Sequence, residues 1–131
     1  MQESFWLIST IEVKDYEEYV KEYGSNKPVK LAVTKMLTLH DLIGTLLYKK
    51  LIDIDLVHLA LSINATKVIY KRLSPILPGI RKGMNEPVLF VGFDYLVSEL
   101  TRKEPQLRKD VKQMMERSKM TSDKKDREKT S

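Results

Sequence analysis

The sequence lacks cysteine altogether, and it has only two histidines, five glycines and five prolines. Without cysteine the chain forms no disulfide and has neither a thiolate nucleophile nor a cysteine-ligated zinc site. Such a composition suits a reducing compartment, so we expect a cytoplasmic protein. Because glycine and proline are scarce, long stretches remain in which nothing interrupts a helix.

Long apolar runs are also missing. The run at residues 5–8 is far shorter than the roughly 20 residues that cross a bilayer. No basic segment precedes it, as one would in a secretory signal peptide. We therefore expect no transmembrane segment.

An excess of positive charge is found only near the C-terminus. Residues 1–101 contain 12 Lys or Arg and 12 Asp or Glu, whereas residues 102–131 contain 11 and 6 and carry the whole net charge of +5. The neutral body argues against a broad basic face for nucleic acid. With 131 residues, 42% hydrophobic and 31% charged, the chain is expected to form one folded domain.

The apolar residues recur at helical spacing. Asp15 and Glu18 have the form of a capping box, and Gly24 is placed to end the helix that follows. The most regular pattern covers residues 33–51, and Gly44 inside it suggests close approach of another helix. The apolar stripe of that segment consists of Val33, Met36, Leu37, His40, Ile43, Leu47 and Leu51.

Further helices are expected along the rest of the chain. Asp53 or Asp55 can cap one, and Ser62 or Asn64 can cap the next. Pro75 and Pro78 should kink or end the second of these, and a turn is expected at residues 79–83. We expect the helix after Asp53 to point these residues inward: Leu56, Val57, Leu59, Ala60 and Leu61.

The predicted fold is all-α, an irregular or orthogonal bundle of about five or six helices. Residues 33–51 and 87–100 are expected at its centre, the second helix opening at Pro87. Glu104 and Pro105 should interrupt the pattern before one last amphipathic helix. The domain is expected to cover residues 1–117 and a disordered basic tail residues 118–131, since those residues are almost entirely polar.

Catalytic and metal-binding patterns are not found. His40 and His58 show neither the His-x-x-x-His nor the Glu-x-x-His spacing that places two ligands on one helical face, so we predict no metal and no cofactor. The pair His40 and Asp41 is similar to the metal-binding dipeptide of HD-type phosphohydrolases, which leaves a metal-dependent hydrolase as one alternative. No nucleophile elbow or phosphate-binding glycine loop is present. A non-catalytic protein without a small-molecule ligand is favoured.

A row of basic residues supports a second alternative, a nucleic-acid-associated protein whose helix face and tail contact phosphates. A solvated helix face explains the same residues without a ligand. The row consists of Lys67, Lys71, Arg72, Arg81 and Lys82.

Apolar residues near the two ends favour a non-catalytic protein-interaction or scaffold module, with a protein partner or self-association. The apolar surface at the two ends is larger than a small monomer is expected to expose. It is contributed by Phe5 and Trp6 at one end and by Met114 and Met115 at the other. These four residues are the predicted interaction surface.

Several segments resemble a family of small helical prokaryotic domains of unknown function. In that family an Ile-Gly-x-Leu helix is followed by an Ile-Asp-x-Asp-Leu connection and by a helix with Tyr or Trp, proline and arginine. Here the matching segments are LIGTLL at 42–47, LIDIDLV at 51–57, YKRLSPI at 70–76 with Arg81, and FDYL at 93–96, within residues 36–100. The resemblance implies a helical fold and no particular reaction. His40 departs from the pattern, since an acidic residue is commoner there.

Overall fold

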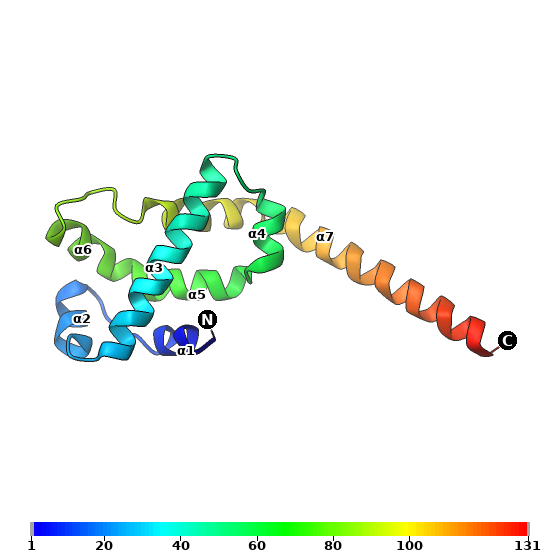
Figure 1. The fold of residues 1–131 in the computed structure, drawn as a ribbon, viewed down its shortest axis with the longest axis horizontal. Helices are drawn as coiled ribbons and strands as arrows, with labels where there is room; N and C mark the ends of the chain where they lie inside the picture. The colour runs from blue at the N-terminus through cyan, green and yellow to red at the C-terminus, as the bar shows by residue number, and fades with distance from the viewer. Residues whose placement is uncertain (1, 131) are drawn as a thin grey trace. The chain divides into compact units, whose positions relative to one another are not determined.

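The computed structural model describes the backbone of residues 2–130 and the side chains of residues 3–128. All regular secondary structure in these residues is helical (Figure 1). The all-α prediction is therefore confirmed. The elements are α1 Gln2–Ser9, α2 Tyr16–Tyr23, α3 Lys27–Tyr48, α4 Ile54–Ala60, α5 Ile63–Leu73, a short 3₁₀ turn η1 Ser74–Ile76, α6 Leu77–Gly83 and α7 Val91–Thr130. Residues 1–101 form one compact unit and residues 102–131 a second.

Side-chain caps fix where most of these helices begin. The Asp15 carboxylate accepts a hydrogen bond from the Glu18 amide at 2.8 Å, as the capping pattern predicts. Asn26 starts α3 in the same way, accepting from the Val29 amide at 3.1 Å, with Pro28 in the first turn. Of the paired alternatives, Asp53 caps α4 and Ser62 caps α5. Local sequence therefore determines the helix starts in the first half of the chain.

The core of the first unit lies where α3 packs on α1 and α5, with α2 beside α6 (Figure 1). α3 contacts this core along most of its length. Five of the seven residues in its predicted apolar stripe are buried. The buried cluster comprises Ile8, Ile11, Tyr19, Val29, Ala32, Val33, Met36, Leu37, Ile69, Leu73, Ile76, Leu77 and Phe93.

Two glycines let α3 and the start of α7 touch backbone to backbone. A Cβ added to Gly44 would lie 1.7 Å from the carbonyl oxygen of Gly92. The Asp41 carboxylate accepts a hydrogen bond from the Gly92 amide at 2.9 Å at the same crossing. The predicted close approach at Gly44 is thus present, and it explains a glycine in the middle of a helix.

Residues 79–90 differ from the prediction. The expected turn at residues 79–83 is part of α6, because Gly79 and Gly83 both take up a helical backbone there. The helix expected from Pro87 begins only at Val91, since Phe90 has a left-handed backbone with φ 62° and stops helical turns from continuing across it. Phe90 keeps this conformation while its ring packs against the core cluster.

The C-terminal prediction also differs from the structure. α7 runs through Pro105 without interruption, although proline removes the hydrogen bond to the carbonyl of residue 101, which is where the first compact unit ends. The same helix continues to Thr130, where a disordered tail was expected from residue 118; Ser131 lies outside the described residues. The Lys, Arg and Glu residues of this segment are good helix formers, and oppositely charged residues four apart, such as Asp123 with Arg127 and Lys124 with Glu128, favour a helix that needs no apolar face. No helix in the described part of the chain is apolar over a length that would cross a membrane.

Candidate functional site

The basic row predicted from the sequence is partly occupied by carboxylates. Arg72 forms an ion pair with Glu12 at 3.3 Å, and Arg81 forms one with Asp94 at 2.7 Å. Lys71 and Lys82 are exposed, whereas Lys67 is half-buried. At least two of the five cations thus serve contacts within the first unit, which weakens the idea of a phosphate-binding row.

Arg81 belongs to a polar cluster that joins three helices. Its Nη2 donates to Asp94 at the start of α7, and its Nε donates to the Leu89 carbonyl at 2.7 Å. The hydroxyl of Tyr70 on α5 donates a hydrogen bond to the other oxygen of Asp94. Burial, followed by the Asp94 hydrogen bond, raises the pKa of Tyr70 to about 12, so the phenol stays protonated as a donor. Tyr70 and Arg81 together occupy both oxygens of the Asp94 carboxylate, so the cluster is suited to holding the three helices together.

The sequence pattern places Arg81 in the basic row and gives no sign that Asp94 would lie beside it. The two come together because α6 brings Arg81 back against the start of α7, across the turn that includes Leu89. The three side chains of the cluster all lie in the segments on which the family resemblance rests: Tyr70, Arg81 and Asp94.

His40 and Asp41 do not form a shared site. The His40 imidazole is 1% exposed, its Nδ1 lies 2.7 Å from the Met36 carbonyl, and its ring stacks on Phe93 at 4.6 Å. Burial lowers the pKa of His40, which keeps the ring neutral. Asp41 instead binds the Gly92 amide. No group of three or more potential metal ligands occurs in the part of the chain that the structure describes.

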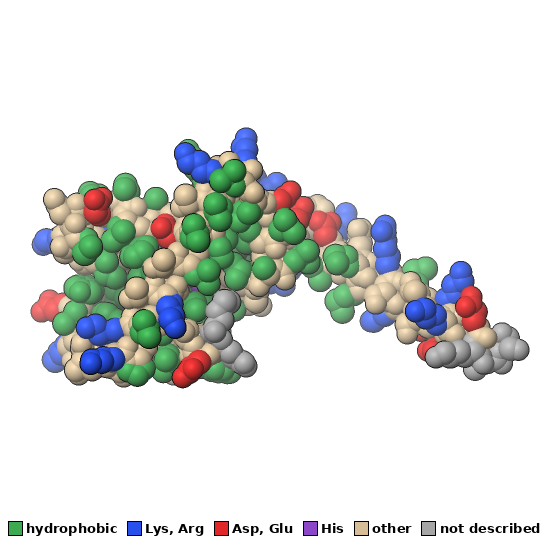
Figure 2. Space-filling view, viewed as in Figure 1, with side chains coloured by type: hydrophobic (Ala, Val, Ile, Leu, Met, Phe, Trp, Pro, Cys, Tyr) green, Lys and Arg blue, Asp and Glu red, His purple; other side chains and the backbone are tan. Residues whose placement is uncertain are grey.

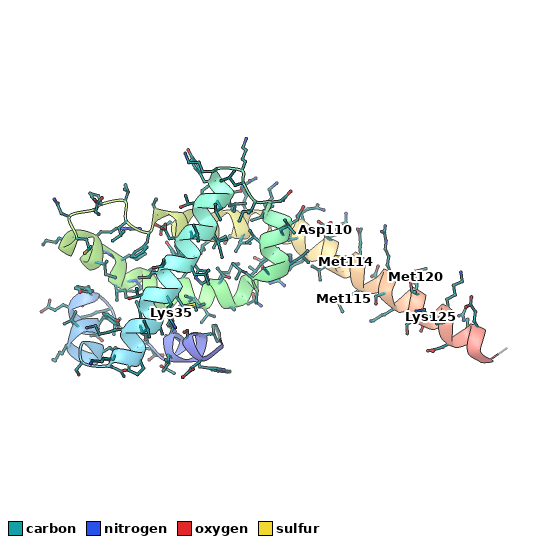
Figure 3. All side chains as sticks on the ribbon, in the orientation of Figure 1. Lys35, Asp110, Met114, Met115, Met120 and Lys125 are labelled. Atoms are coloured by element: carbon teal, nitrogen blue, oxygen red, sulfur yellow. The ribbon has the colours of Figure 1, made fainter. Side chains whose placement is uncertain are left out.

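The predicted interaction residues are only partly available. Trp6 is 62% exposed, while Phe5 packs against the core cluster and meets Trp6 edge to face. In the second unit, Met114 and Met115 are both more than half exposed on α7 (Figure 3). Met120, which the prediction did not include, is exposed there too.

A larger apolar surface lies on α3, α4 and the turn between them. Figure 2 shows hydrophobic side chains gathered over the C-terminal half of α3 and over α4. The expected inward packing of α4 is wrong for three residues, since Leu56 is 63% and Leu59 is 61% exposed and Ala60 is exposed too. Leu51, expected at the end of the buried stripe, is 71% exposed in the turn after α3. We call this region the α3–α4 surface.

A small pocket opens on the α3–α4 surface. Its volume is about 180 Å³, smaller than the roughly 300 Å³ at which small-molecule sites usually begin. Every residue that lines it is aliphatic: Ile43, Ile52, Leu56, Val57, Ala60 and Leu61. The pocket therefore suits one aliphatic side chain better than a polar ligand or a cofactor.

The sequence contains one signal that could have located this surface. Of α4's apolar residues, Val57 and the capping Leu61 are four apart and buried, whereas Leu56 and Leu59 lie on the other face. A helix of seven residues that is apolar on both faces can bury only one of them against a single neighbour. The periodicity was therefore compatible with burial of either face.

Comparisons of this chain with protein-family models, with curated proteins and with solved structures gave no match.

Proposed function

We propose that this protein is a non-catalytic interaction module that binds an amphipathic helix of a protein partner on the α3–α4 surface. The observation that carries the proposal is the pocket lined only by aliphatic side chains, with Leu51, Leu56 and Leu59 exposed around it. Exposed apolar side chains that form one continuous patch are typical of protein–protein interfaces, whereas single exposed apolar side chains are common on any surface.

The chemistry of the pocket supports a helical partner with an apolar anchor. An aliphatic lining offers no hydrogen bonds, so binding depends on an apolar anchor whose polar backbone is already satisfied, as it is in a helix. Leu, Ile and Met are the side chains that fit such a volume. Apolar neighbours one turn away on the partner helix would cover Leu56 and Leu59.

The remaining candidates are less well supported by side-chain contacts. Arg72 and Arg81 hold carboxylates of this chain, which reduces the number of basic side chains on α5 and α6 that could contact phosphate. The hydrolase alternative required His40 and Asp41 to converge on a metal, yet each binds a different backbone group.

Photo-crosslinking in the cells that produce the protein tests the proposal. A benzophenone amino acid at position 59 should give one discrete product, identified by mass spectrometry, because Leu59 faces the partner. The same group at Trp6, which is 62% exposed on α1, is the matched control. We expect Leu56→Asp to abolish the product from position 59. Equal products from positions 59 and 6, or none from 59, would contradict the proposal.

A further inference from the structure

We infer that the helix covering the α3–α4 surface is α4 of a second copy of this chain, with Leu59 of each copy in the other's pocket. This inference rests on the proposed function and names the partner. Two-fold pairs use the same patch on both subunits, so such a patch must carry both an anchor and a pocket that receives it. The α3–α4 surface carries both.

The anchor and the pocket lie on the same short helix. Leu59 is 61% exposed and does not line the pocket, while Leu56 and Ala60 on either side of it do. α4 thus presents an exposed aliphatic side chain beside a pocket lined by aliphatic side chains. When two α4 helices meet about a two-fold axis, each supplies what the other lacks.

The charges around Leu51 are also self-complementary. Lys49 and Lys50 precede it, Asp53 and Asp55 follow it, and all four side chains are exposed. Lys50 has a left-handed backbone with φ 59°, so the chain turns between the lysines and the aspartates that follow. A two-fold axis near Leu51 would set the lysines of one copy opposite the aspartates of the other. Such rim charges fix register and orientation more than they add affinity.

A neutral first unit adds no net repulsion between copies, since residues 1–101 hold equal numbers of acidic and basic side chains. The exposed leucines are few, so the interface belongs near the lower end of the roughly 1,200–2,000 Å² of stable complexes. Reversible dimers with a dissociation constant on the order of micromolar are expected.

Sedimentation equilibrium of the full chain, from about 1 μM to about 1 mM, tests this inference. We expect a monomer–dimer equilibrium for the natural chain and a dissociation constant raised about 100-fold by Leu59→Asp. Lys49→Glu and Asp55→Lys should each weaken the dimer several-fold, and the double variant Lys49→Glu/Asp55→Lys should restore it. Trp6→Ser, which removes an equally exposed aromatic elsewhere in the unit, should leave dimerisation unchanged. Circular dichroism confirms that each variant is folded.

The outcomes separate this inference from the proposed function. A natural chain that stays monomeric to about 1 mM, while position 59 crosslinks to a different protein, overturns the second-copy partner and leaves the interaction module standing. A dimer that Leu59→Asp leaves intact, or that Trp6→Ser dissociates, also overturns the inference. Monomers together with no crosslink at position 59 overturn both.

Discussion

Replacing Gly44 with Ala should destabilise the first unit by about 3 kcal/mol or more, at the top of the range for inserting a methyl group into a close contact. The added Cβ would lie 1.7 Å from the Gly92 carbonyl oxygen, and that atom belongs to a backbone that cannot rotate away. α3 and the start of α7 would have to separate. The Asp41 hydrogen bond to the Gly92 amide would then be lost with the contact. Urea unfolding followed by circular dichroism measures the change.

Gly83→Ala is the matched control for Gly44→Ala. Gly83 also has a helical backbone, as the last residue of α6, but an added Cβ there meets no atom within 4 Å. Alanine is intrinsically better than glycine in a helix by up to about 1 kcal/mol, so the control should be neutral or slightly stabilised. If Gly44→Ala and Gly83→Ala had the same unfolding free energy, α3 and α7 would not meet at Gly44 and Gly92.

Replacing Asp94 with Ala should lower the free energy of unfolding by about 2–3 kcal/mol. The change leaves the Arg81 guanidinium and the Tyr70 hydroxyl without their common acceptor. The Arg81 side chain is only 22% exposed, so water replaces the lost partner incompletely. Because one carboxylate serves both donors, Tyr70→Phe should cost much less in the Asp94→Ala background than in the natural chain.

Glu12→Ala is the control for that prediction. It breaks the ion pair with Arg72, in which the glutamate is 78% exposed, and the expected change is within about 0.5 kcal/mol. The comparison thus measures what burial adds to an arginine–carboxylate contact. If Asp94→Ala and Glu12→Ala had the same small effect, the three-helix cluster would not be a structural tie.

The part of the fold that the sequence predicts well is local. Asp15 and Asp53 cap their helices through hydrogen bonds to amides two or three residues on, and such contacts depend on neighbouring residues alone. α3 is also predictable, because its stripe repeats over many turns. Gly44 could be read correctly since a glycine in the middle of a regular helix requires a reason.

The errors arise where tertiary contacts or weak local preferences decide. Phe90 is held in a left-handed backbone, and its ring packs on the core, so Pro87 does not begin the helix. The polar residues after Ser118 lack an apolar face, which predicts disorder, whereas the structure has them in α7, where charge pairs four apart suit a solvated helix. The Arg81–Asp94 contact joins α6 to α7, and no spacing rule predicts it.

The orientation of α4 matters most for function, because it decides whether Leu56 and Leu59 belong to the core or to a surface that a partner can reach. The most direct test is the free energy of unfolding of Leu56→Gln/Leu59→Gln, measured at a concentration low enough to keep the chain monomeric, beside that of Val57→Ala. Val57 is 5% exposed on the opposite face of α4. We expect the double variant to remain within about 1 kcal/mol of the natural chain, while Val57→Ala loses about 2 kcal/mol. A double variant that loses as much as Val57→Ala, or more, would place the two leucines in the core and contradict the α3–α4 surface.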